Sequence, residues 1–154
     1  MQSTLRAMRP APIAFGGIVV DVGGTLMASY ALLIVYVQIQ LNSGALTPLD
    51  LEADNGRAVM DMFLNDPAAL ALSLLIGLVM TALGGFWAAR MAGRLELFHG
   101  LGAGTVSLLV GEILFTDGGS LPGWYSVLGY GLHLPVAVAG SWFARSRSRH
   151  GSPL

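Results

Sequence analysis

Four long stretches almost free of charged side chains constrain this fold more than any other feature. They cover residues 12–40, 67–89, 97–115 and 124–144, and the second contains no charged residue at all. A helix needs about 20 apolar residues to cross the hydrocarbon core of a bilayer. Charged residues make up only 11% of the chain, too few to cover a water-exposed surface. The sequence therefore predicts one all-α membrane domain over residues 1–154, with four transmembrane helices in an antiparallel bundle.

Residues 84–104, GGFWAARMAGRLELFHGLGAG, define the arrangement of the two central spans. This stretch is typical of the end of one spanning helix, a short basic turn and the start of the next. Arg90 and Arg94 lie in or beside a turn too short for anything but a tight helical hairpin. Glycines on both sides of the turn allow the two helices to approach closely.

The distribution of arginine predicts the orientation in the membrane. Lysine is absent, and in a four-span arrangement seven of the eight arginines fall on one side. These are Arg6, Arg9, Arg90, Arg94, Arg145, Arg147 and Arg149. The eighth, Arg57, lies in the opposite loop 42–66 among Asp50, Glu52, Asp54, Asp61 and Asp66. Cytoplasmic loops carry the excess of basic residues. We therefore expect both termini in the cytosol and the loop 42–66 outside it.

The loop 42–66 carries a helix-start signal, Thr47 followed by Pro48. Val59, Met60, Phe63 and Leu64 then follow at helical spacing. Two interpretations fit this pattern, a short helix on the membrane surface and a partly ordered acidic loop. Asp66 and Pro67 repeat the cap-and-proline signal at the start of the second span.

Small residues at four-residue spacing predict where the helices pack, because lipid offers no hydrophobic drive between them. Each span carries one small or polar stripe, and the glycines expected at helix contacts are Gly77, Gly84, Gly85, Gly100, Gly104 and Gly129. In the first span, Gly17, Asp21 and Thr25 should share one face.

Ionisable residues inside a membrane are costly, so they are candidates for function. Three lie within the spans, Asp21, Glu112 and His133, and Thr25 follows Asp21 by one turn. A functional interpretation makes Glu112 and His133 a proton-sensitive pair, with Asp21 deeper in the same path. In the structural alternative, Glu112 reaches the interface, His133 bonds a neighbouring helix, and Asp21 bonds Thr25 or glycine-exposed backbone.

The basic side offers candidates for binding anionic lipid headgroups. They are Arg90, Arg94, His99, Arg145 and Arg147. The same arginines serve equally as anchors that set topology, and His99 could instead cap the start of the third span.

Several chemistries have no signature in this chain. HExxH, GxSxG, the phosphate loop and CxxC are all missing, and there is no cysteine. Three scattered histidines at different depths do not form a metal or haem cage and leave room only for a single axial ligand. The sequence thus implies no cofactor, no metal and no nucleic-acid partner.

Two segments resemble families of small uncharacterised four-span bacterial inner-membrane proteins. One is VDVGGT, from Val20 to Thr25 in the first span. The other is the hairpin pattern of Gly84, Gly85, Ala88, Ala92 and Gly93, then His99, Gly100 and Gly104, with Ala89 where such families often have glycine. The resemblance implies a location in the bacterial inner membrane and brings no activity with it.

The chain is therefore expected to be a non-enzymatic integral membrane protein. It would serve as an accessory or scaffold subunit of a larger membrane complex, or as a homo-oligomer. The alternative is a small transporter or proton-coupled channel that uses Asp21, Glu112 and His133.

Overall fold

The computed structural model describes residues 8–52, 56–115 and 121–150, and most of these are helical, with no β-strand among them. Four helices are long and apolar enough to cross a membrane, which confirms this part of the prediction. The first span runs from Pro10 to Ser43 and consists of α2 (Pro10–Ala14), the π-helical segment η1 (Phe15–Gly23) and α3 (Gly24–Ser43). The others are α6 (Pro67–Ala92), α7 (Glu96–Phe115) and α8 (Gly123–His150).

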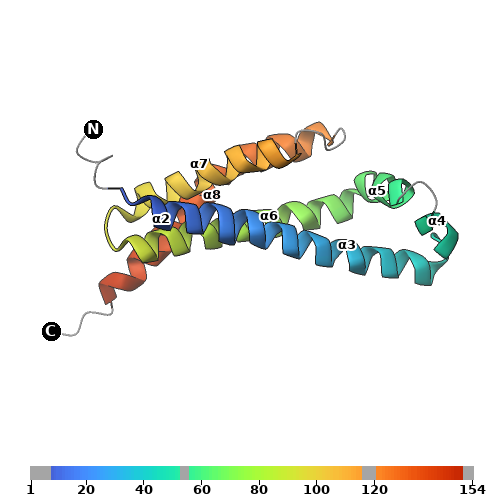
Figure 1. Cartoon of the computed structure of the whole chain (residues 1–154), viewed down its shortest axis with the longest axis horizontal. Coiled ribbons are helices and arrows are strands. Elements are labelled where there is room, and N and C mark those ends of the chain that lie inside the picture. Colours follow the sequence, from blue (N-terminus) through green and yellow to red (C-terminus); the bar gives the residue numbers. More distant parts are fainter. Residues whose placement is uncertain (1–7, 53–55, 116–120, 151–154) are drawn as a thin grey trace.

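Helix α6 is the centre of the molecule. It packs against the first span, α7 and α8, and its contacts with the first span and with α8 are more extensive than that with α7. The first span and α8 each pack against both α6 and α7 but touch each other little, so they lie on either side of the α6–α7 pair. The start of α2, the α6–α7 turn and the end of α8 all lie at one end of the molecule (Figure 1).

The helix ends follow from local chemistry. The Asp66 side chain caps α6 by accepting hydrogen bonds from the backbone N–H groups of Ala68 at 2.9 Å and Ala69 at 3.2 Å. Pro67 occupies the first helical position, where its missing N–H costs nothing. Only residues 93–95 separate α6 from α7, and Gly93 has the left-handed φ of 65° that ends a helix. The tight hairpin predicted here is confirmed.

Three spans extend beyond their predicted bounds. The first continues to Ser43 and ends at Gly44, whose φ of 75° is left-handed. α6 runs three residues past the predicted end at Ala89. α8 begins at Gly123 and continues as helix to His150, through the arginine-rich tail. Arg6, Asp54 and the turn 116–120 lie outside the described residues, as do the side chains of Asp50, Arg147 and Arg149.

The loop 42–66 contains two short helices, α4 (Pro48–Glu52) and α5 (Arg57–Leu64), at the far end of the molecule (Figure 1). One residue of the apolar stripe predicted on α5, Phe63, contacts α3, whereas Met60 is exposed. Phe63 meets Tyr36 edge-on with ring centroids 5.2 Å apart, and the Tyr36 hydroxyl donates to the Met62 carbonyl at 3.3 Å. Val59 is buried. The short helix is thus held by protein contacts with the end of the first span.

Glycines allow α6 and α8 to touch backbone to backbone. A Cβ atom added at Gly85 would lie 2.0 Å from the Ala137 carbonyl oxygen, and one at Gly140 would lie 2.0 Å from the Ala82 carbonyl oxygen. A Cβ at Gly100 of α7 would overlap the Ser141 side chain of α8. At this crossing α6 and α8 meet with no side chain between them, and only the small Ser141 side chain lies between α7 and α8.

The first span packs by the same means. A Cβ added at Gly16 would lie 2.4 Å from the Gly84 carbonyl oxygen on α6, and one at Gly17 would lie 2.5 Å from the Ala103 carbonyl oxygen on α7. This glycine pair therefore fits between the two central helices. Of the other glycines predicted at contacts, Gly104 lies against Ala137, whereas Gly77 and Gly129 have neighbours only at ordinary or longer distances.

Candidate functional site

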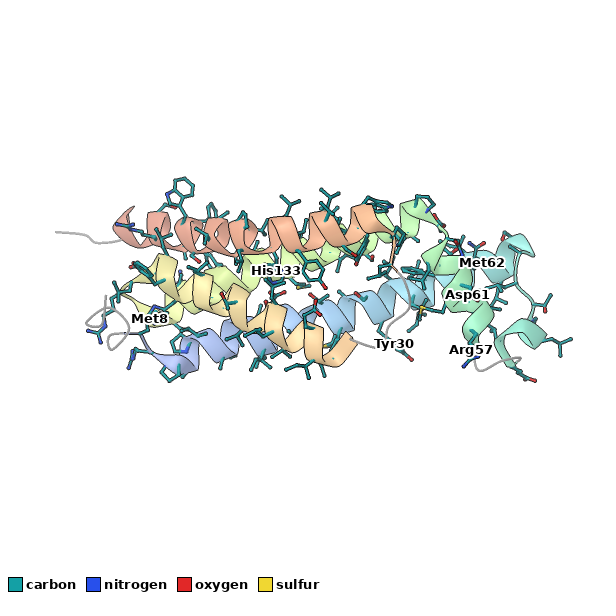
Figure 2. All side chains as sticks on the ribbon, turned by 90° about the horizontal axis from the view of Figure 1, so that it is seen from above. Met8, Tyr30, Arg57, Asp61, Met62 and His133 are labelled. Carbon is teal, nitrogen blue, oxygen red and sulfur yellow. The ribbon has the colours of Figure 1, made fainter. Side chains whose placement is uncertain are left out.

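One residue from each of the four spans meets in a buried polar cluster, which we call the four-helix polar cluster: Asp21, Thr81, Ser107 and His133. Thr81 lies eleven residues before the end of α6 and Ser107 eleven residues after the start of α7, about 16 Å along each helix at 1.5 Å per residue. The cluster thus lies near the middle of a hydrocarbon core about 30 Å thick. Figure 2 shows His133 between the helices, midway along the bundle.

Asp21 reaches the cluster because the backbone that carries it is π-helical. In an α-helix, two residues five positions apart point about 140° away from each other. The i→i+5 bonding of a π-helix instead places Asp21 above Gly16 on one face. A Cβ at Gly84 would accordingly meet both the Gly16 carbonyl oxygen, at 2.5 Å, and the Asp21 Cβ, at 3.0 Å. Gly17, one residue after Gly16, contacts α7, the helix that supplies Ser107 to the cluster.

His133 lies in a turn of α8 that also holds Pro135. Proline has no N–H, so Pro135 cannot donate to the Gly131 carbonyl one turn earlier. His133 enters between α6 and α7 from the side opposite the first span. Its side chain is 17% exposed and that of Asp21 only 5%, so the neighbouring helices cover most of both ionisable groups.

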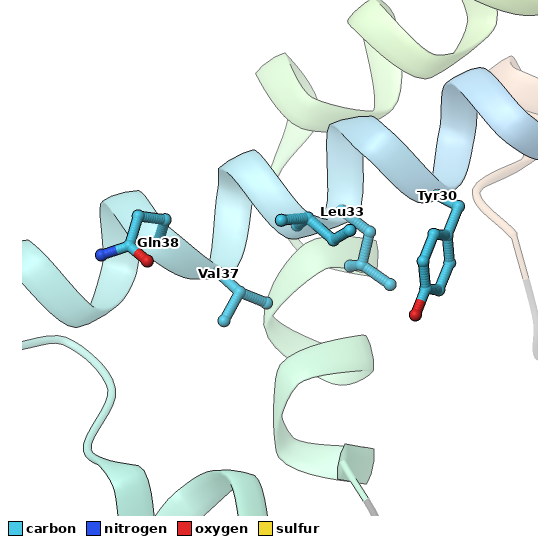
Figure 3. A pocket seen from close by; sticks show the side chains of 5 residues that line it. Tyr30, Leu33, Val37 and Gln38 are labelled. Carbon is cyan, nitrogen blue, oxygen red and sulfur yellow. The ribbon is translucent and has the colours of Figure 1, made fainter.

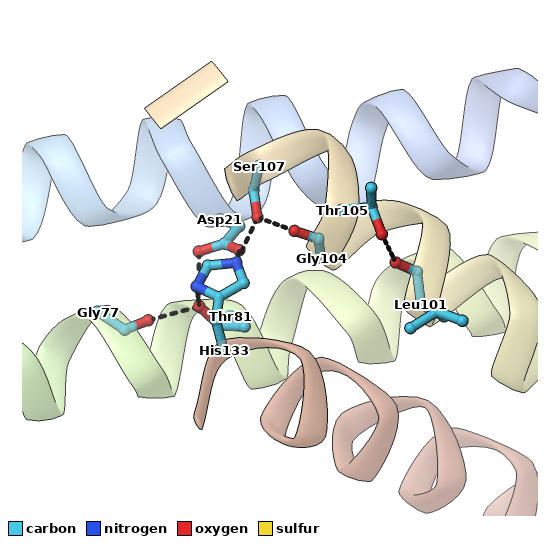
Figure 4. A network of polar contacts seen from close by, with 8 residues as sticks. All are labelled: Asp21, Gly77, Thr81, Leu101, Gly104, Thr105, Ser107 and His133. Atoms are coloured by element: carbon cyan, nitrogen blue, oxygen red, sulfur yellow. Dashed lines mark hydrogen bonds and ion pairs between the residues drawn. The ribbon is translucent and has the colours of Figure 1, made fainter. Parts of the chain in front are cut away.

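The hydrogen bonds of the cluster converge on the His133 ring (Figure 4). Nε2 of His133 lies 2.6 Å from the Ser107 hydroxyl and 3.3 Å from Oδ2 of Asp21. Nδ1 lies 3.4 Å from the Thr81 hydroxyl, which also donates to Oδ1 of Asp21 at 3.0 Å. Thr81 and Ser107 lie within reach of carbonyl oxygens of their own helices, Gly77 at 3.0 Å and Gly104 at 3.1 Å.

The pairing within the membrane differs from the one predicted. His133 contacts Asp21, whereas Glu112 bonds the Tyr130 hydroxyl at an exposed position near the end of α7. The predicted pair of Glu112 and His133 is therefore wrong, because five residues on α7 separate Glu112 from Ser107, the residue that does meet His133. The alternative partner predicted for Asp21, Thr25, lies beside Gly77, and the Asp21 carboxylate bonds Thr81 and His133 instead.

Two members of the cluster were missed among the candidate site residues. They are Thr81 of the second span and Ser107 of the third. A signal existed for both: Thr81 lies four residues from Gly77 and Gly85, and Ser107 lies seven residues from Gly100, so each belongs to the packing face of its helix. Hydroxyls on a packing face commonly bond across helices.

His99 forms a second buried polar contact, at the start of α7. Its side chain is 0% exposed. Nε2 accepts a hydrogen bond from the backbone N–H of Arg9 at 3.0 Å, and Nδ1 lies 3.0 Å from the Leu95 carbonyl oxygen. These partners require a neutral ring with its proton on Nδ1. The prediction of a headgroup contact for His99 is wrong, because the ring caps the N-terminus of the first span from inside the bundle.

The headgroup candidates with described side chains lie at the same end of the molecule. Arg90 and Arg94 are exposed beside the α6–α7 turn, and Arg145 is half-buried near the end of α8. Helix α8 extends through Arg147, whose side chain lies outside the described part. Arg57 lies at the opposite end together with Asp61 (Figure 2).

A shallow hollow is lined by Tyr30, Leu33, Ile34, Val37 and Gln38 (Figure 3). All five belong to α3, so this is the outer surface of one helix. Within the described ranges no three His, Asp or Glu side chains gather as metal ligands.

Comparison with known proteins adds no relative. No protein-family model matches the chain, and neither a curated protein nor a solved structure matches it. The interpretation of the cluster therefore depends on its geometry.

Proposed function

We propose that this chain is a non-enzymatic integral membrane protein that serves as an accessory or scaffold subunit of a larger membrane assembly, or as a homo-oligomer. One observation carries the proposal: the polar side chains inside the spans bond one another. Among the described residues every buried side-chain nitrogen and oxygen has a hydrogen-bond partner. Transport and catalytic sites need polar groups that are free to bind a substrate, whereas the polar groups of the four-helix polar cluster bond one another.

The uncovered surface of the first span supports a partner. Only 6% of the most apolar window of this span is buried, against 33% for α6. Met27, Tyr30 and Ile34 are 79%, 68% and 56% exposed along α3. Lipid can cover an apolar surface of this kind, and so can the helices of another subunit that pack closely against it.

The proposed orientation is that of an inner-membrane protein of bacterial type, with both termini in the cytosol and helices in an antiparallel bundle. Contacts between α6 and α8 support opposite helix directions, since Ala82 meets Gly140 while Gly85, later on α6, meets Ala137, earlier on α8. The positive-inside rule supports the orientation. Exposed Arg90 and Arg94 then meet the cytoplasmic leaflet, where anionic lipid headgroups attract basic side chains.

Site-specific photo-crosslinking in native membranes tests the scaffold proposal. A photoreactive residue at Met27 on α3 should give a discrete adduct of dimer or partner size. The matched control is Val127 on α8, which is 72% exposed and should give little. A lone monomer in native mass spectrometry, with no discrete adduct at Met27, contradicts the proposal.

The contact between Asp21 and His133 favours a second candidate, a small transporter or proton-coupled channel. Paired ionisable groups at mid-membrane are typical of proton relays. Glu112 of the predicted path lies outside the cluster. In a liposome flux assay Asp21→Asn should abolish transport and Glu112→Gln should preserve it. Unchanged flux in Asp21→Asn, or no flux in the parent protein, rules this candidate out.

A further inference from the structure

We infer that Asp21 and His133 form a proton-binding site, in which one proton beyond those of a carboxylate and a neutral imidazole is shared between the two side chains. The ligand is the proton itself, and the hydroxyls of Thr81 and Ser107 complete the site. The inference follows from counting donors and acceptors in the four-helix polar cluster. It does not depend on whether the protein is a scaffold or a transporter.

The Thr81 side of the ring requires a donor. Thr81 has one hydroxyl proton, and the strongest acceptor within its reach is the Asp21 carboxylate at 3.0 Å. Once that proton is committed, the Thr81 oxygen faces Nδ1 of His133 at 3.4 Å with lone pairs only. A hydrogen on Nδ1 satisfies this contact, and a bare nitrogen leaves two acceptors facing each other.

The opposite side of the ring requires a proton as well. Nε2 of His133 and Oδ2 of Asp21 lie 3.3 Å apart, and both are acceptors when the carboxylate is ionised and the nitrogen is bare. A proton on either atom turns this contact into a hydrogen bond. Ser107 can donate to the Gly104 carbonyl while its oxygen accepts from Nε2 at 2.6 Å.

A neutral imidazole beside an ionised Asp21 cannot meet both demands. With hydrogen on Nε2, the contact between Nδ1 and Thr81 has no proton. With hydrogen on Nδ1, the contact between Nε2 and Asp21 has no proton. One additional proton places a hydrogen in both contacts of the ring, to Thr81 and to Asp21, in either of two arrangements: imidazolium with carboxylate, or imidazole with carboxylic acid. In the second arrangement Nε2 is an acceptor, so the Ser107 hydroxyl donates to Nε2 and not to the Gly104 carbonyl.

Charge supports the same count. Without the additional proton the cluster carries one net negative charge near the middle of the membrane, which is costly; with it the net charge is zero. The sequence supplies no compensating group, since α6 has no titratable residue between Asp66 and Arg90, and α7 none between His99 and Glu112. The first span and α8 also contain tyrosines, Tyr30 and Tyr36 on α3 and Tyr125 and Tyr130 on α8, and these are neutral at pH 7 when unperturbed.

The proton also joins two helices that otherwise touch little. Asp21 belongs to the first span and His133 to α8, and these lie on either side of the α6–α7 pair. Loss of the proton leaves one of the two ring contacts without a hydrogen, either the contact to Thr81 on α6 or the contact to Asp21 on the first span. Where it is the contact to Asp21, the first span is held less firmly against the bundle.

Nitrogen-15 NMR of histidine-labelled protein in lipid bilayers at neutral pH tests the inference, together with the infrared carboxyl band of Asp21. Contacts to carbon-13-labelled aspartate identify the His133 signals in the unmodified protein. The expected result is one additional proton: either both ring nitrogens protonated and Asp21 ionised, or one ring nitrogen protonated and Asp21 a carboxylic acid. A neutral ring beside an ionised Asp21, or imidazolium beside a carboxylic acid, overturns the inference.

His99 is an internal control, because its partners require a neutral ring with the proton on Nδ1. Asp21→Asn should lose any imidazolium signal of His133, and Glu112→Gln should leave that signal unchanged. Imidazolium that persists in Asp21→Asn overturns the sharing of the proton. If Asp21→Asn does not fold, the NMR and infrared spectra of the unmodified protein still test the inference. Failure here leaves the crosslinking and flux tests of function unaffected.

Discussion

Replacing Gly85 by alanine perturbs the closest approach between α6 and α8. A Cβ at this position would lie 2.0 Å from the Ala137 carbonyl oxygen, whereas ordinary van der Waals contacts lie at 3.4–4 Å. The two helices would have to separate by the difference, about 1.4 Å. The obstacle is backbone, so no side-chain rotation relieves it.

The expected loss of stability has two parts. Overpacking a close-packed interior costs about 1–3 kcal/mol. The separation also weakens the hydrogen bond from the Ser141 hydroxyl to the Gly85 carbonyl, 3.3 Å long, and such bonds within membranes average about 0.6 kcal/mol. Gly85→Ala should therefore lower the free energy of unfolding by about 2–4 kcal/mol.

The assay is reversible unfolding of the purified protein in bicelles, followed by tryptophan fluorescence and helical circular dichroism. Gly131→Ala is the matched control: it lies on α8, is exposed, and a Cβ there would meet nothing within 4 Å. It should be neutral or stabilise the protein by up to about 1 kcal/mol, because alanine is the better helix former. Equal unfolding free energies for Gly85→Ala and Gly131→Ala would refute the reasoning.

Three smaller changes test other contacts. Thr81→Val keeps the side-chain shape but removes the hydroxyl that bonds Asp21, and should cost about 0.6–1.7 kcal/mol in the same assay; Thr81→Ser, which keeps the hydroxyl, should cost less. Asp66→Ala removes the cap of α6 and should cost about 1 kcal/mol, and no change would contradict the capping role. His99→Phe leaves the Arg9 N–H without its acceptor, so amide exchange at Arg9 should accelerate while exchange within α6 does not.

The existence of the four spanning helices could be predicted from local sequence, and so could a helix end where a capping residue marks it. Asp66 followed by Pro67 is both the predicted and the observed start of α6. The end of the first span was harder, since the sequence stays helix-compatible after Gln40 until Gly44 supplies the left-handed turn. Apolar length identifies a span, but only a capping residue locates its end.

The partners of Asp21 could not be read from spacing. An α-helical count places Gly17 and Thr25 on its face, but the π-helical segment rotates Asp21 toward Gly16 and α6. Its partners Thr81 and His133 lie 60 and 112 residues later in the chain, so only tertiary packing brings them to Asp21.

The role of His99 illustrates the same limit. Its position at the start of a span favours an interfacial group by sequence. The acceptor role depends on the backbone N–H of Arg9, 90 residues earlier in the chain. Pro10 and Pro12 have no backbone N–H group, so Arg9 carries one of the few backbone donors at the start of α2. The His99 ring supplies the acceptor that this donor would otherwise lack.

Labelling of single cysteines in intact cells tests the four-span arrangement most directly, because the chain contains no cysteine of its own. With a membrane-impermeant thiol reagent, Ala45→Cys and Leu121→Cys should react in intact cells. Met8→Cys, Met91→Cys and Ser146→Cys should react only after permeabilisation. Reaction of Met8→Cys and Ser146→Cys on opposite sides of the membrane would contradict the account.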